Sequence, residues 1–155
     1  MANAIKWSAL GTYTTAIAGA ATAPTLKNLA NNTGKLGNAI DNATSGRDIY
    51  SEWELYVRCA SAPTGNPFVD LYFIESADGT NYEDPGSSDS PVPAKMPVIT
   101  FPIRLVATQQ RIVIPRLILP PFKFKPMIWN NTGQAFTNTD NENVLSYRTY
   151  NEEIQ

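Results

Sequence analysis

SEWELYVRCASAPTGNPFVDLYFIESADGTNYED, residues 51–84, is the stretch that decides the fold. Large apolar side chains occupy every second position in two runs, which is the pattern of a strand with one buried face. The members of the apolar face are Trp53, Leu55, Val57 and Cys59 in the first run and Val69, Leu71 and Phe73 in the second. Asp78-Gly79 then ends the second strand with a turn, because this dipeptide tolerates positive φ. Two such strands need a second layer to cover their apolar face.

Further strands are expected at residues 98–106, 111–119, 122–129 and 144–150. Pro102 favours an edge position for the first of them, because proline cannot donate to a central ladder. Residues 111–119 are apolar on both faces and are therefore expected to be covered on both sides. Roughly eight short strands with turn residues between them predict an all-β protein, an antiparallel β-sandwich that is jelly-roll-like or Ig-like.

Residues 1–48 are poor in large apolar side chains and rich in Ala, Thr, Asn and Gly. This composition predicts an extended N-terminal arm over residues 1–35, with short strands near 4–9 and 26–31, and a β-sandwich domain over residues 36–155. Residues 151–155 are expected to form a polar tail. The proline-rich stretch 85–97 shows no periodicity and predicts a long exposed loop, either a contact surface or a tolerated insertion.

Composition excludes several function classes. The 155 residues contain no histidine and one cysteine, Cys59, so the usual His-dependent triads and metal sites cannot form, and we expect no catalytic, cofactor or metal site. The net charge of −2, without a basic stripe, argues against nucleic-acid and membrane partners. Glu52 and Glu54 share a strand face with the spacing of a solvated acidic row, although a two-carboxylate glycosidase is formally possible. The residues around Asp78 are interpreted as a turn rather than a calcium loop.

Candidate contact residues come from aromatic and apolar side chains that the alternation does not place inward. Trp7 and Tyr13 lie in the arm, Ile112 and Ile114 in the strand that is apolar on both faces, and Met127 and Trp129 follow two lysines on the outward face of residues 122–130. Together they predict a self-association surface. A bulge at Pro126 that turns Trp129 into the domain's own core is the alternative.

Three passages resemble a family of small virion proteins of tailed bacteriophages and prophages. They are LGNAIDN (36–42) leading into EWELYVR (52–58), VDLYFIESADGTNYED (69–84), and LPPFKFKPMIWNNTGQAF (119–136) with LSYRTYNEE (145–153). The resemblance covers residues 36 to the C-terminus.

The resemblance implies a non-enzymatic structural protein, a decoration or cement protein on the capsid exterior, made in the cytoplasm of the host bacterium. Its expected partners are the major capsid protein and itself, as a homotrimer at threefold or quasi-threefold sites of the shell. Two alternatives stay open: a carbohydrate- or receptor-binding module of a head or tail fibre, and an accessory domain of a secreted enzyme.

Overall fold

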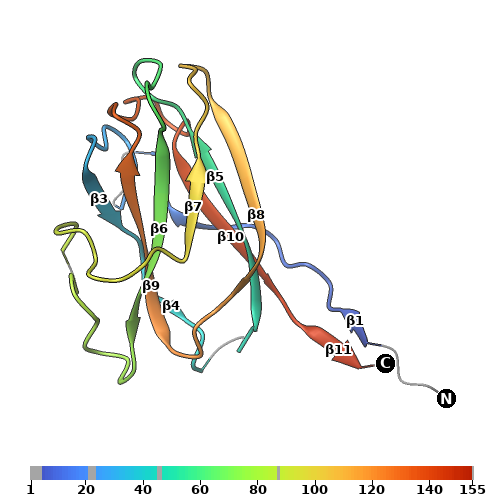
Figure 1. The fold of residues 1–155 in the computed structure, drawn as a ribbon. Helices are drawn as coiled ribbons and strands as arrows, with labels where there is room; N and C mark the ends of the chain where they lie inside the picture. Colours follow the sequence, from blue (N-terminus) through green and yellow to red (C-terminus); the bar gives the residue numbers. More distant parts are fainter. Residues whose placement is uncertain (1–4, 21–23, 45–46, 87, 155) are drawn as a thin grey trace.

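The computed structural model describes residues 5–20, 24–44, 47–86 and 88–154, and these residues contain strands, turns and loops but no helix. The strands are β1 (Ile5–Trp7), β2 (Thr14–Ile17), β3 (Thr33–Leu36), β4 (Ile40–Asp41), β5 (Tyr50–Val57), β6 (Phe68–Ser76), β7 (Ile99–Pro102), β8 (Gln110–Ile118), β9 (Lys123–Asn131), β10 (Val144–Tyr150) and β11 (Glu152–Ile154). One sheet has the order β2-β10-β5-β8, and the other has the order β3-β9-β6-β7 with β4 also on β9. The two sheets enclose one core, so the predicted β-sandwich is confirmed (Figure 1).

The strand pairs are nested along the chain. The innermost pair is β6 with β7, followed outward by β5 with β8, β3 and β4 with β9, and β2 with β10. Additional β10–β5 and β9–β6 pairings join these pairs into the two sheets. A long antiparallel pair wound over itself in this way has the jelly-roll topology, which decides between the two sandwich types that the sequence left open.

The core between the sheets is aromatic. The Trp53 ring lies 5.3 Å from that of Phe73 and 5.0 Å from that of Tyr147, and Phe73 lies 4.6 Å from Phe124, all measured between ring centroids. The buried Trp53 indole N–H donates to the Ser51 hydroxyl at 2.9 Å, so its polar atom is satisfied. The inward faces expected for β5 and β6 are therefore confirmed, but β6 is buried on both faces, because Tyr72 and Ile74 are buried as well.

The outer face of the second sheet carries a second apolar cluster, which we call the outer cluster. Its buried members are Leu36, Tyr72, Ile74 and Met127, with Tyr82 and Trp129 packed at the margin. The β6–β7 connection contacts this cluster: the Asp89 carboxylate accepts from the Leu36 N–H at 2.8 Å, and the Lys95 ammonium donates to the Phe73 carbonyl at 2.7 Å. The loop predicted to be exposed is thus anchored over part of a sheet face.

The boundary expected at residue 35 is not a structural boundary. β2 pairs with β10 in one sheet and β3 pairs with β9 in the other, and the side chains of Ile17 and Leu26 are completely buried. The strand predicted at 26–31 is wrong, because this stretch forms a turn after an isolated bridge at Thr25. Among the strands described within the expected arm, β1 alone stands apart from the sandwich.

β1 pairs with β11 in a two-stranded ribbon that projects from the body (Figure 1). The C-terminal segment predicted to be a polar tail therefore contains a strand. At the other end of the nested pairs, β7 is shorter than predicted and ends at Pro102, on the edge of its sheet as expected. β8 is the edge strand of the other sheet, and Val113 and Ile118 are exposed rather than covered.

Candidate interaction surface

The acidic side chains on the outer face of the first sheet are held in ion pairs. Glu52 accepts a hydrogen bond from Arg148 Nε at 2.9 Å and one from the Tyr13 hydroxyl, and a second guanidinium nitrogen of Arg148 lies 2.7 Å from the same carboxylate oxygen as an ion pair. Glu54, which is only 5% exposed, pairs with Arg111. Burial, followed by the hydrogen bond and charge of Glu52, raises the pKa of Tyr13 to about 12. The row predicted to be solvated is a paired network.

The Asp78 side chain is fully engaged in its turn. Its carboxylate accepts from the backbone N–H groups of Asn81 and Thr80, at 2.7 and 2.8 Å, and from the side chains of Asn81 and Ser76. These hydrogen bonds, led by those from the backbone, hold the pKa of Asp78 well below its usual range. Within residues 5–20, 24–44, 47–86 and 88–154, no three acidic or cysteine side chains gather as a group able to hold a metal ion.

Cys59 behaves as the small apolar residue that its position predicted. The thiol is buried at 1% exposure beside the Thr132 hydroxyl, 3.6 Å away. Burial raises the pKa of the thiol, which disfavours the nucleophilic thiolate.

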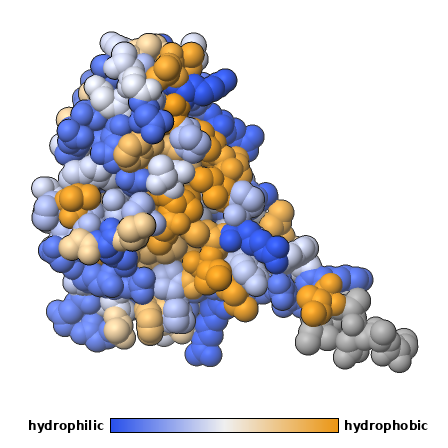
Figure 2. Space-filling view, in the orientation of Figure 1, coloured by the Kyte–Doolittle hydropathy of each residue, from blue (hydrophilic) through white to orange (hydrophobic). Residues whose placement is uncertain are grey.

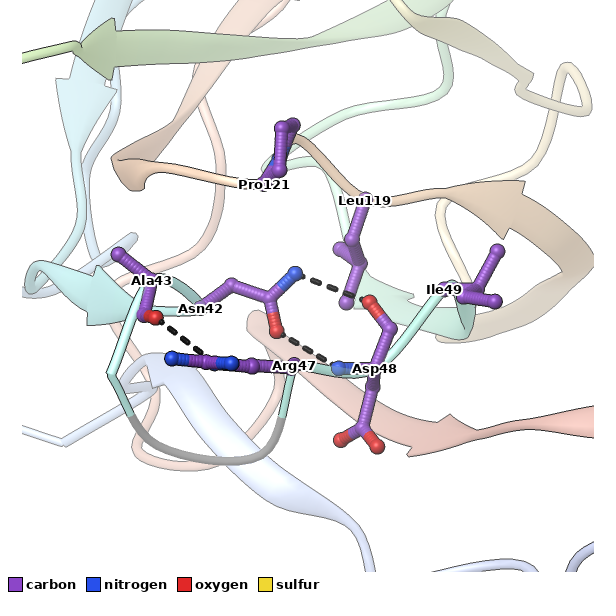
Figure 3. Close-up of a pocket in the computed structure, with 7 residues that line it drawn as sticks. All are labelled: Asn42, Ala43, Arg47, Asp48, Ile49, Leu119 and Pro121. Carbon is purple, nitrogen blue, oxygen red and sulfur yellow. Dashed lines mark hydrogen bonds between the residues drawn. The ribbon is translucent and has the colours of Figure 1, made fainter.

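A cavity of about 480 Å³ lies between the β4–β5 loop and the end of β8, lined by Asn42, Ala43, Arg47, Asp48, Ile49, Leu119 and Pro121 (Figure 3). The polar groups that line the cavity make hydrogen bonds within the β4–β5 loop. Asn42 donates to the Asp48 carbonyl and accepts from the Asp48 N–H, both at 2.9 Å, and the Arg47 guanidinium donates to the Ala43 carbonyl. The Asp48 carboxylate accepts from the Asn151 amide at 2.7 Å. These groups stabilise a turn more than they prepare a ligand site.

An aromatic cluster joins the projecting ribbon to the body. Trp7 meets Tyr50 and Tyr150 edge-on at 5.7 and 5.6 Å, and the two tyrosine rings stack at 5.7 Å. The Arg116 guanidinium lies 4.8 Å from the centre of the Trp7 ring and 3.9 Å from a carboxylate oxygen of Glu152. Because Trp7 is still 50% exposed, this cluster offers one aromatic surface at the base of the ribbon.

Several exposed apolar side chains gather on the side of the sandwich bounded by β7 and β8. Figure 2 shows an apolar strip that runs down the face on which β7 and β8 lie in Figure 1. The exposed large apolar side chains of residues 99–131 are Leu105, Val106, Val113, Ile118 and Phe122. We call the edge of β8 together with the β7–β8 loop the open edge.

The open edge is also basic. Residues 90–139 contain no acidic side chain and six basic ones: Lys95, Arg104, Arg111, Arg116, Lys123 and Lys125. Three of these arginines lie on the open edge, and no hydrogen bond or ion pair among the described residues involves the Arg104 guanidinium. By contrast, residues 59–94 contain six acidic side chains and no basic one, so charge is segregated along a nearly neutral chain.

The six predicted contact residues do not form one surface. Met127 is completely buried in the outer cluster and Trp129 is half-buried beside it, while β9 pairs with β6 in unbroken register, without the bulge considered at Pro126. Ile112 and Ile114 are half-buried at the open edge and pack against the main core. Trp7 lies on the ribbon. Tyr13 belongs to the ion-pair network of the first sheet.

Sequence reasoning missed the most exposed members of the open edge, Leu105 and Ile118. Two signals were present in the sequence. Residues 111–119 are apolar on both faces, and no acidic residue lies between Asp89 and Asp140.

Comparisons with known proteins identify no relative: no family model, no curated protein and no solved structure matches the chain. The residues that the structure describes include no helix long and apolar enough to span a membrane.

Proposed function

We propose that this chain is a non-enzymatic structural protein of a tailed-phage virion that decorates the outside of the major capsid shell and stabilises it. The observation that carries the proposal is the combination of an open apolar edge with a projecting terminal ribbon, in a protein whose described acidic side chains are largely engaged in ion pairs and turns. Such an arrangement supports binding to other protein surfaces rather than chemistry.

The fold supports this role without requiring it. A jelly roll gives a rigid two-layer body without disulfides, and the buried thiol of Cys59 suits a protein made in a reducing bacterial cytoplasm. Jelly rolls occur in viral capsid domains but also in lectins and cupins, so fold alone does not choose a function. The proposed partners are the major capsid protein and other copies of this chain, arranged as a homotrimer.

A carbohydrate- or receptor-binding module of a head or tail fibre is the second candidate. The half-exposed Trp7, with Tyr50 and Tyr150 beside it, is the observation that favours it, because exposed aromatic rings stack on sugar rings. Arg116 already covers part of the Trp7 ring, which reduces the surface available to a sugar.

The deciding experiment uses particles purified from the strain that encodes this chain, together with particles from a strain in which its gene is deleted. We expect the purified chain to co-sediment with the deletion particles, to saturate at a fixed copy number and to raise their melting temperature. A chain that is absent from wild-type particles and does not bind deletion particles contradicts the proposal. Selective binding on a glycan array, without particle binding, supports the second candidate.

A further inference from the structure

We propose that the open edge of one copy binds strand β11 of a second copy, head to tail, so that the β1–β11 ribbon continues the β2-β10-β5-β8 sheet of its neighbour. The proposal names the surfaces for the self-association in the proposed function. The proposal rests on the proposed function only in expecting that copies of the chain associate. The contact itself is argued from the structure of the chain and does not require a virion.

The backbone of the open edge is suited to accept a strand. β8 pairs with β5 alone, so its other side has no strand partner among the described residues. The β5–β8 register is regular over Gln110–Ile114 and shifts beyond Ile114, where Pro115 lacks an N–H and Arg116 takes a φ of 63°. A partner strand is therefore expected to pair with residues 110–114.

β11 carries negative charge, whereas the open edge carries positive charge. Glu152 and Glu153 are both exposed, although Glu152 lies 3.9 Å from Arg116 of its own chain and Glu153 is opposite Lys6 of β1. Among the described residues β11 pairs with β1 alone, so its second side has no strand partner there. The neighbour would present Arg104 and Arg111 close to the start of β8, where the Gln110 side chain closes the loop onto the backbone of Arg104 at 2.8 and 3.2 Å. Opposite charges on two unpaired strand edges favour this pairing over pairing of β8 with β8, which would bring arginines together.

The ribbon itself needs a cover. A two-stranded ribbon is marginal in water, and Ile5 and Trp7 are 70% and 50% exposed on a ribbon that projects from the body (Figure 1). Docking on the neighbour's edge would bury them against its exposed apolar side chains, among them Leu105 and Val113. Because the two contact surfaces differ, the contact is heterologous and repeats from copy to copy. The assembly closes into a ring, such as a trimer, when the rotation between successive copies permits it.

The test combines oligomeric state with a charge exchange. Native mass spectrometry and light scattering of the full chain should show a closed oligomer that dissociates on dilution. Arg104→Glu and Glu153→Lys should each weaken association by about tenfold or more, because each places like charges at the contact. The double variant Arg104→Glu/Glu153→Lys should recover most of the loss. Arg47→Glu, the same change of charge on the exposed β4–β5 loop, is the matched control and should associate like the wild type.

Hydrogen exchange then locates the contact. Peptides that cover residues 110–114 and 151–154 should gain protection as concentration rises, and the Glu153→Lys variant should not show that gain. A chain that stays monomeric at high concentration overturns the proposal. So does an oligomer that neither single variant weakens, or one whose protection from hydrogen exchange lies outside residues 110–114 and 151–154. Protection of residues 110–114 that appears only with particles assigns the open edge to the shell and also overturns it. If the chain is monomeric but still binds particles, the self-association proposal fails and the proposed function stands. If the chain forms the β8–β11 oligomer but is absent from particles, the proposed function fails and the self-association proposal stands.

Discussion

The outer cluster and the open edge are both apolar surfaces of sheet strands, yet only the first is covered by its own chain. Met127 is completely buried on the outer face of β9, whereas Ile118, near the end of β8, is 68% exposed. The difference lies in the connections: a long anchored loop follows β6, while the loop between β7 and β8 is closed on itself by Gln110. Apolar alternation therefore marks a surface that needs a cover, but the length and anchoring of nearby loops decide whether the cover is internal.

The largest expected effect tests whether the outer cluster is core. Met127→Ala should lower the free energy of unfolding by about 2–5 kcal/mol, because it removes buried atoms and leaves a cavity. Ile118→Ala at the open edge is the matched control and should change it by no more than about 0.5 kcal/mol. Urea unfolding at low protein concentration measures both. Equal losses in the two variants would remove the distinction between the surfaces.

The second prediction concerns the anchor of the covering loop. Asp89 accepts from the Leu36 N–H at 2.8 Å and pairs with Lys35 at 2.6 Å, so Asp89→Ala should lower the free energy of unfolding by about 1 kcal/mol at a partly exposed site. The amide of Leu36 should also exchange faster. Asp84→Ala, in the same connection but without a side-chain hydrogen bond or ion pair among the described residues, serves as the control. If both substitutions act alike, Asp89 is not the anchor.

The turn that begins this connection should make stability depend on pH. The pKa of Asp78 is lower in the folded protein than its ordinary value of about 3.9, so the carboxylate contributes stability above that pH and loses it as pH falls toward the folded value. Asp78→Asn should therefore melt at a lower temperature than the wild type at pH 6, and the gap should begin to narrow as pH falls below about 4 and shrink further toward the folded pKa. A gap that stays constant down to pH 2 would show that ionisation of Asp78 plays no part.

The fold was predictable where side chains are large and alternate. Trp53 and Phe73 identify the buried faces of β5 and β6, and Asp78-Gly79 identifies the turn, where Gly79 takes a φ of 76°. The strand near residues 4–9 was predicted and corresponds to β1, but β2 and β3 were missed because their packing uses small residues. A Cβ on Gly19 would lie 2.6 Å from a methyl of Val144, and one on Gly34 would lie 2.4 Å from the Met127 methyl, so close approach replaces bulk there.

The candidate surface was predictable only in part, because burial depends on contacts between distant segments. Met127 and Trp129 follow two lysines on an outward face, and nothing local shows that Gly34 and the β6–β7 loop lie against them. The pairing of β11 with β1 joins the two ends of the chain, and residues 151–154 alone have too few apolar side chains to predict a strand.

The smallest expected effect returns to the open edge. Val113→Thr keeps the shape and β-branching of the side chain and exchanges a methyl group for a hydroxyl. Val113 is 38% exposed, so the hydroxyl stays in contact with water, and the free energy of unfolding should change by less than about 0.5 kcal/mol. Val69→Thr makes the same exchange at a completely buried position of β6 and should lose about 1–3 kcal/mol, because a hydroxyl buried without a partner loses its hydration. Thermal and urea unfolding at the lowest workable concentration compare the pair, since association through the open edge would add its own stabilisation at higher concentration. A loss at Val113 as large as that at Val69 would mean that β8 is covered within one chain. A loss at Val113 that appears only as concentration rises would show that a second copy supplies the cover.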